Sequence, residues 1–129
     1  MADSGAIDPA RVLCQIADLD GGCREFRLGR GDWPLRGFVV QVGEEVRAYV
    51  NRCAHLNYPL NYMPHQFLSY DGSMIQCFVH GAIFEKSTGY CVGGPCSGLS
   101  LIALPVRVQS GYVLLGDDAD PEELAERYA

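Results

Sequence analysis

The sequence predicts an all-β protein of antiparallel strands with one short helix near its C-terminal end. Short stretches rich in β-branched and aromatic residues recur at close spacing, and turn residues separate them. Signals for a helix start occur only in the last dozen residues. A length of 129 residues suits a single domain, residues 1–129, that is large enough to bury a core of its own.

Four strands are expected in the first part of the chain. Each is a run of apolar and β-branched residues next to a turn, and the runs cover 11–17, 24–28, 37–42 and 46–51. Gly43-Glu44-Glu45 connects the third strand to the fourth, as a short hairpin turn would. The first part of the chain therefore predicts an antiparallel sheet.

The later part of the chain predicts two hairpins and the helix. One hairpin joins 74–77 to 82–85, and the other joins 104–108 to 112–115 through Gln109-Ser110-Gly111. Asp120 is the expected helix cap and Pro121 the first helical residue, with acidic residues following where the helix dipole favours them. The helix is expected to end near Tyr128.

Composition and charge exclude several classes of protein. Hydrophobic residues make up 48% and charged residues 20% of the chain, which is ordinary for a soluble protein. No apolar run approaches the roughly 18 residues of a membrane span, and the N-terminus lacks an export signal, so a cytoplasmic protein without membrane attachment is expected. The net charge of −6 comes mostly from an acidic tail, residues 117–129, and it disfavours nucleic acid. Such a tail more often aids solubility than docks a basic partner.

Two short clusters of metal-binding side chains dominate the middle of the sequence. Cys53-Ala54-His55 precedes Cys77-Phe78-Val79-His80, with twenty-one residues between His55 and Cys77. Thiolate is a soft ligand and imidazole a borderline one, so this set suits either iron–sulfur chemistry or zinc. The donors of Cys-x-His are too close to meet comfortably at a single ion and would point toward different metals. The spacing thus favours a two-iron cluster over zinc, which remains the alternative.

In a 2Fe–2S centre with two histidines in place of two cysteines, one iron takes both thiolates and the other takes both imidazoles. Each of the two clusters in the sequence would then supply one ligand to each iron. The two boxes resemble the C-x-H and C-x-x-H ligand boxes of the Rieske family. Downstream, Thr88-Gly89 and Gly93-Gly94-Pro95 stand where that family has a loop closing over the cluster, and residues 104–108 resemble the strand that returns to the base.

The resemblance covers residues 11–116 and has implications for fold and site. It implies a β-sandwich or barrel base with an inserted cluster-binding subdomain at about 52–97, and one 2Fe–2S cluster per chain. The implied site residues are Cys53, His55, Cys77, His80, Gly81, Gly94 and Pro95, of which the first four are the metal ligands.

The same resemblance implies a soluble protein of the low-potential type. High-potential members carry a disulfide between the ligand loops, at positions that are Tyr58 and Val79 here. They also carry a serine and a tyrosine that donate hydrogen bonds to the cluster, where this chain has Ala82 and Phe84. The expected reduction potential is therefore near about −150 mV.

The remaining cysteines and the spacer between the boxes have less specific signals. In a cytosolic protein Cys14, Cys23, Cys91 and Cys96 are expected to be free buried thiols, with a redox-responsive Cys91 and Cys96 as the alternative. His65 is expected on the surface or in a hydrogen bond. The apolar segment 58–67 either packs beneath its own loop or docks a partner.

The predicted function is that of a one-electron carrier. The sequence has no flavin or nicotinamide fingerprint and no visible two-histidine, one-carboxylate iron site, so a catalyst acting by itself is not expected. The chain resembles a ferredoxin that passes electrons from a reductase to a terminal oxygenase or another redox protein; no oligomeric state is predicted. Two alternatives stay open. One is the Rieske-like subunit of a nitrite reductase or ring-hydroxylating dioxygenase, and the other is a redox-sensing interaction protein.

Overall fold

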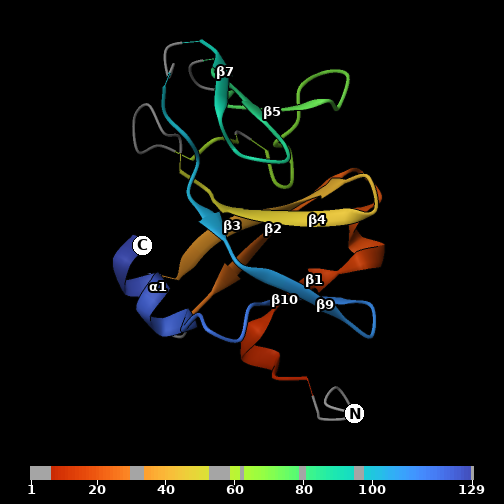
Figure 1. Cartoon of the computed structure of the whole chain (residues 1–129), viewed down its shortest axis with the longest axis vertical. Helices are drawn as coiled ribbons and strands as arrows, with labels where there is room; N and C mark the ends of the chain where they lie inside the picture. The colour runs from red at the N-terminus through yellow and green to blue at the C-terminus, as the bar shows by residue number, and fades with distance from the viewer. Residues whose placement is uncertain are drawn as a thin grey trace.

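The computed structural model of the chain describes residues 7–29, 34–52, 59–61, 63–78, 81–94 and 98–128. In this part of the chain the strands form three antiparallel sheets that lie one above another (Figure 1). The strands are β1 (Val12–Gln15), β2 (Cys23–Leu28), β3 (Leu35–Val42), β4 (Glu45–Val50), β5 (Met74–Gln76), β6 (Ile83–Glu85), β7 (Cys91–Gly93), β8 (Ala103–Leu104), β9 (Val106–Gln109) and β10 (Tyr112–Leu115). The predicted all-β class is confirmed.

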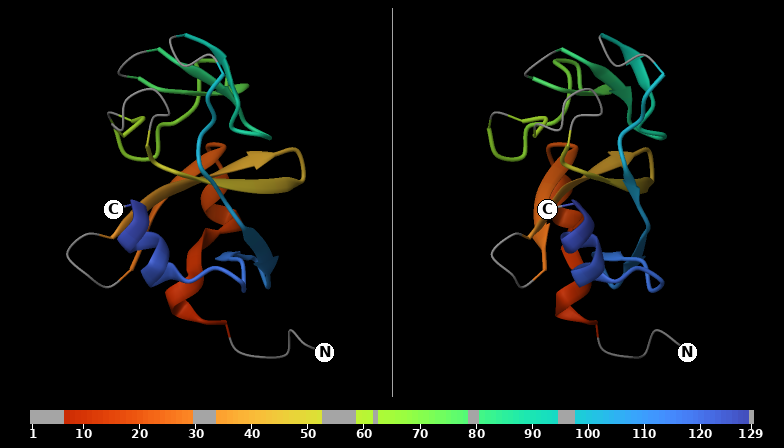
Figure 2. Two further views of the ribbon diagram at one scale, coloured as in Figure 1. Left: turned by 60° about the vertical axis from the view of Figure 1, so that its left-hand side comes forward. Right: turned by 90° about the vertical axis from the view of Figure 1, so that its left-hand side faces the viewer.

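The three sheets differ in which strands form them and in where they lie. The lower sheet has the order β1-β10-β9, the middle sheet β2-β3-β4-β8 and the upper sheet β5-β6-β7. The upper sheet stands above the middle one in all three views (Figures 1 and 2). It is built entirely from residues between the ends of β4 and β8, so the segment with the second ligand box is an insertion into the base formed by the other two sheets.

The middle sheet is buried on both faces because apolar side chains occupy both sets of alternating positions in β3. Leu35 and Val39 face the lower core, whereas Phe38 and Val40 face the upper core. Tyr49 of β4 also belongs to the upper core. The upper core is completed by Cys23, Leu60, Phe67, Ile75, Cys77, Ala82, Phe84, Cys91 and Leu101. The middle sheet of the base and the inserted sheet therefore share the upper core.

Two predicted strands differ from those observed. The first is shorter than 11–17, because Ile16–Leu19 forms a 3-10 turn after β1. The strand predicted at 104–108 is interrupted at Pro105, which separates β8 in the middle sheet from β9 in the lower sheet. Proline has no N–H to donate to a ladder, and its carbonyl instead accepts a hydrogen bond from Gly116 N–H at 2.8 Å. The chain passes from the middle sheet to the lower sheet at Pro105.

The C-terminal helix agrees with its prediction. Helix α1 (Pro121–Tyr128) begins after Asp120, whose Oδ1 accepts a hydrogen bond from Glu122 N–H at 3.0 Å. The helix packs against β2 and β3, with Ala125 buried (Figure 2). The acidic segment thus has a packed side as well as a solvated one. No helix in the described ranges has the length and apolarity needed to span a membrane.

Candidate metal centre

The structure describes part of the predicted ligand set. Cys77, Gly81 and Gly94 lie within the described residues, whereas Cys53, His55, His80 and Pro95 lie outside them. No group of three or more histidine, cysteine or acidic side chains that could hold a metal occurs among the described residues. The site is therefore described from Cys77 and from the segments that flank the other ligands.

Cys77 is a free thiol at the end of β5 and is completely buried. Its N–H donates to the carbonyl of Ala82 at 2.8 Å, and its own carbonyl accepts from Gly81 N–H at 2.8 Å. These two bonds close a tight turn between β5 and β6, with Gly81 in the left-handed region at φ 75°. These bonds fix the backbone at Cys77, and its buried side chain lies in the upper core.

Gly94 lies against this turn. Its φ is 86°, and a Cβ at this position would lie 2.8 Å from Ala82 Cα and 3.1 Å from the carbonyl oxygen of Gly81. Only glycine permits so close an approach of two backbones without a shift of one of them. Gly94 therefore packs directly on the turn that contains the second predicted ligand box.

Leu60 connects the second box to the flank of the first. Its carbonyl accepts a hydrogen bond from Phe78 N–H at 2.9 Å, and Phe78 is next to Cys77. The N–H of Leu60 donates to the side-chain oxygen of Asn51 at 2.8 Å. Asn51 in turn lies two residues before Cys53. A short hydrogen-bonded path therefore runs from the second predicted box to the residue that lies two positions before the first.

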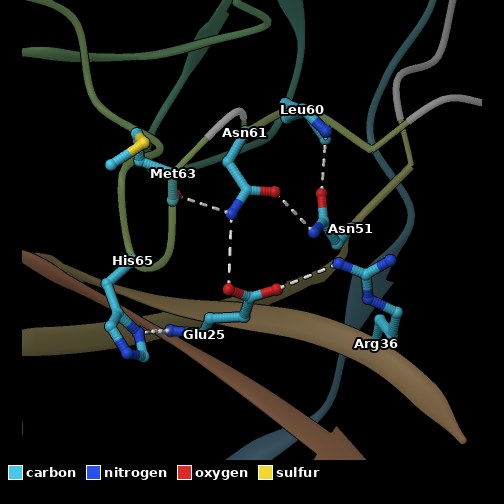
Figure 3. Close-up of polar contacts among 7 residues, drawn as sticks. All are labelled: Glu25, Arg36, Asn51, Leu60, Asn61, Met63 and His65. Carbon is cyan, nitrogen blue, oxygen red and sulfur yellow. Dashed lines mark hydrogen bonds and ion pairs between the residues drawn. The ribbon is translucent and has the colours of Figure 1, made fainter.

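A second polar path leads from Asn51 into the base (Figure 3). Asn51 Nδ2 donates to Asn61 Oδ1 at 3.0 Å, and Asn61 Nδ2 donates to Glu25 Oε1 at 3.3 Å and to the carbonyl of Met63 at 2.9 Å. Glu25 is mostly buried, and its other oxygen accepts from Arg36 Nη2 at 3.3 Å. The spacer is thereby attached to β2 and β3.

The rest of the spacer is also fixed to β2. His65 Nδ1 accepts a hydrogen bond from Glu25 N–H at 3.0 Å, and the Cys23 thiol donates to the His65 carbonyl at 3.1 Å. Burial raises the pKa of this thiol above its ordinary value of 9.0, so it stays a donor at neutral pH. Phe67 is fully buried and stacks on Phe38 at 4.1 Å between ring centroids. His65 is hydrogen-bonded, as expected, and Leu60 and Phe67 pack inward.

The remaining cysteines follow their prediction only in part. Cys14 and Cys23 are free and buried, which confirms the prediction for both. Cys91 is disulfide-bonded, so its prediction as a free thiol is wrong, and Cys96 lies outside the described residues. The N–H of Cys91 donates to the carbonyl of Leu99 at 2.9 Å, which shows that the chain returns beside β7 after the glycine-rich segment. A sequence does not reveal such a return, and spacing alone does not distinguish a thiol from a disulfide.

The fold and the site together define a class. Cys77 is a buried thiol on a turn that contains Gly81, and the two boxes add a second cysteine and two histidines. This combination is typical of β-sheet proteins that hold an iron–sulfur cluster on loops. The family model of the Rieske [2Fe-2S] domain matches residues 10–105, and the chain belongs to this family. As a member it binds a 2Fe–2S cluster. The predicted family and cofactor are confirmed.

Solved structures show the same fold. A ferredoxin from Sphingomonas yanoikuyae B1 is 25% identical with a TM-score of 0.61, over 82% of this chain and 96% of that chain. A chain from the complex of reduced oxygenase and oxidised ferredoxin in carbazole 1,9a-dioxygenase is 26% identical with a TM-score of 0.61, over 81% and 90%. The ferredoxin of carbazole 1,9a-dioxygenase from Nocardioides aromaticivorans IC177 shares the fold at 24% identity and a TM-score of 0.62, over 85% and 98%. A search of curated protein sequences gives no significant match.

The described residues fit a cluster of this kind. The predicted donor set pairs soft thiolates with imidazoles, and Cys77 is free and buried. No residue larger than glycine fits at position 94 without a shift of the turn from Cys77 to Ala82. Sequence reasoning missed Asn51, Asn61 and Glu25. Asn51 had a detectable signal, because it is a polar residue that follows an apolar strand and lies two residues before the first box. Glu25 and Asn61 had none, since their partners are distant in sequence.

Proposed function

We propose that the protein is a ferredoxin that carries single electrons from a reductase to an oxygenase or a related oxidoreductase, with Cys53, His55, Cys77 and His80 as cluster ligands. The observation that carries the proposal is the fully buried, free Cys77 on a turn closed by Gly81, in a chain of the Rieske family. A 2Fe–2S cluster supplies a centre that takes up and releases one electron. The acceptor class is proposed because ferredoxins of oxygenase systems are among the similar structures.

The residues of this chain would hold the cluster and limit its contact with water. The turn from Cys77 to Ala82 fixes one thiolate, and the upper core around Phe84 excludes water from the side facing the base. Gly94 packs its backbone on Ala82, and we propose that Gly81, Gly94 and Pro95 together cover the cluster. Residues 52–97 would then act as the cluster-binding unit of a single domain.

The proposal is tested by reconstitution. A flavin-containing reductase, NADH, a ring-hydroxylating oxygenase and its substrate are combined with the purified protein, and product is measured with and without it. Product that requires the wild-type protein and is lost with Cys77→Ala supports the proposal. A protein that takes up one electron from the reductase but never passes it to any tested oxygenase argues against that acceptor class.

The alternative as a subunit of a larger oxidoreductase predicts a different result. Such a subunit would remain in a stable complex when the protein is purified gently from its own cells. A free, monodisperse protein with full carrier activity would reject it. A cytoplasmic location, which the sequence predicts, stays a prediction that cell fractionation checks.

A further inference from the structure

Asn51 has an unusual position for a polar side chain. It follows the last residue of β4 and is only 7% exposed. Among the described residues, it is the polar residue that is buried. A buried amide is costly unless its hydrogen bonds are made. Here both ends of the amide are used, which indicates a specific role for the side chain.

The oxygen end of Asn51 links the end of β4, two residues before the first box, to the second box. Oδ1 accepts from the N–H of Leu60, which is itself completely buried, at 2.8 Å. The carbonyl of Leu60 then accepts from Phe78 N–H at 2.9 Å, beside Cys77. One side chain therefore sets the position of Leu60 relative to the end of β4, and Leu60 sets the position of the second box.

The nitrogen end of Asn51 links the same point to the base. Nδ2 donates to Asn61 Oδ1, and Asn61 donates onward to Glu25, whose second oxygen accepts from Arg36 (Figure 3). Leu60 N–H can only donate and the Glu25 carboxylate can only accept, so both amides have a single orientation that satisfies the path. A change of one amide to a carboxylate places two acceptors opposite each other.

We propose that Asn51 is a positioning residue for the cluster. It holds the two ligand boxes at a fixed separation through Leu60, and Asn61 holds it in the required orientation. This inference rests on the proposed function, because it assumes that Cys53 and His55 in the first box and Cys77 in the second bind one cluster. The hydrogen bonds that lead from Asn51 to the second box pass through the backbone of Leu60 and Phe78, so we propose that its effect on the cluster is transmitted by that route.

Two Asn51 variants separate positioning from general stability. Asn51→Ala removes both hydrogen bonds, whereas Asn51→Asp keeps the acceptor for Leu60 and opposes the oxygen of Asn61. Both are expected to broaden the electron paramagnetic resonance (EPR) lines of the reduced cluster, because the ligand geometry becomes heterogeneous. Loss of iron to a chelator should be about tenfold faster in Asn51→Ala, as loss of one or two buried hydrogen bonds implies. Asn61→Ala, which leaves the bond to Leu60 intact, should have a smaller effect.

The matched control is Tyr49→Phe. It removes a hydrogen bond between the base and the inserted subdomain, from Tyr49 Oη to the carbonyl of Lys86 at 2.8 Å, and this bond is not part of the Asn51 path. Urea unfolding of all variants gives the loss of stability that each change causes. A positioning role predicts that Asn51→Asp broadens the EPR lines more than Tyr49→Phe at equal or smaller loss of stability.

Two results would overturn the inference. EPR lines and iron loss of Asn51→Asp and Asn51→Ala that match the Tyr49→Phe control at equal stability would show that Asn51 acts only in folding. If Asn51→Ala does not fold, Asn51→Asp and Asn61→Ala still decide the question, because each retains part of the path. A wild-type protein without a two-iron EPR signal would reject the proposed function and this inference together.

Discussion

The hydroxyl of Tyr49 in β4 donates a hydrogen bond of 2.8 Å to the carbonyl of Lys86, in the turn after β6. The Tyr49 ring also lies against Gly89, where a Cβ would come within 2.8 Å of ring atom Cε1. Burial raises the pKa of this phenol above its ordinary value of 10.0, so it remains a donor across the neutral range. Through this residue β4 is attached to the turn that follows β6.

Tyr49→Phe is expected to lower the free energy of unfolding by about 1 kcal/mol, because one buried hydrogen bond is lost with little change in packing. Urea unfolding monitored by circular dichroism measures this difference. Tyr70→Phe is the control, since Tyr70 is fully exposed. Equal stability of Tyr49→Phe and wild type would show that the hydrogen bond contributes nothing to the attachment of the two sheets.

Gly94→Ala is expected to destabilise the cluster site much more than Gly98→Ala. Both glycines have φ near +87°, but a Cβ at Gly94 meets the backbone of Ala82, whereas one at Gly98 has nothing within 4 Å. The two variants share the cost of a left-handed alanine, and only Gly94→Ala adds a clash. The rate of absorbance loss from the cluster in air measures the effect. Equal rates of absorbance loss in the two variants would mean that the close packing of Gly94 on the Cys77–Ala82 turn does not affect the cluster.

The buried thiol of Cys14 is expected to lower the free energy of unfolding at alkaline pH. Burial, with a smaller contribution from the Asp18 carboxylate, raises its pKa from 9.0 to about 11. The folded state therefore holds the proton after the unfolded state has released it. This contribution is complete below pH 9 and is lost as the pH rises toward 11, by about 2 to 3 kcal/mol in all. Urea unfolding from pH 8 to 11 should show a shallower decline in Cys14→Val than in wild type, and parallel declines would contradict the assignment.

The reduction potential is expected to respond to two hydroxyl groups that the chain lacks. Ala82 and Phe84 are both fully buried near the Cys77 turn. Hydroxyl donors stabilise the reduced, more negative cluster more than the oxidised one. The double variant Ala82→Ser with Phe84→Tyr should raise the potential by roughly 50 to 100 mV, if each bond is worth on the order of 1 kcal/mol. Protein-film voltammetry measures both proteins, and an unchanged or lower potential in the variant would oppose the argument.

Local signals were sufficient for most strands and for the helix. Ser110 and Gly111 both have positive φ, as a tight two-residue hairpin requires, and Asp120 caps α1 as its sequence context indicates. β7 was not predicted, because three residues beside a glycine-rich segment give no periodic pattern. The division of 104–108 between two sheets depends on which partners Pro105 lets each half reach, and a single sequence does not contain that information.

The ligand boxes could be proposed from the sequence, whereas the side chains that support them could not. Cys77 is predicted as a ligand from the types and spacing of the four donors, and Gly94 is predicted to cover the cluster from the resemblance to the Rieske family; both roles stay predictions. Glu25 and Asn61 are 36 residues apart, and their hydrogen bond exists only once the spacer lies on β2. The disulfide of Cys91 likewise could not be distinguished from a free thiol by sequence spacing alone.

The central claim is that two cysteines and two histidines of the two boxes hold one two-iron cluster. Metal and sulfide analysis of the purified protein, combined with pulsed EPR of its reduced form, tests this most directly. The account predicts about two iron atoms and two acid-labile sulfides per chain, with couplings from two directly bound imidazole nitrogens. The His55→Ala variant should lose either the whole cluster or one of the two nitrogen couplings. Zinc in place of iron, a cluster without nitrogen couplings, or an unchanged spectrum in His55→Ala would contradict it.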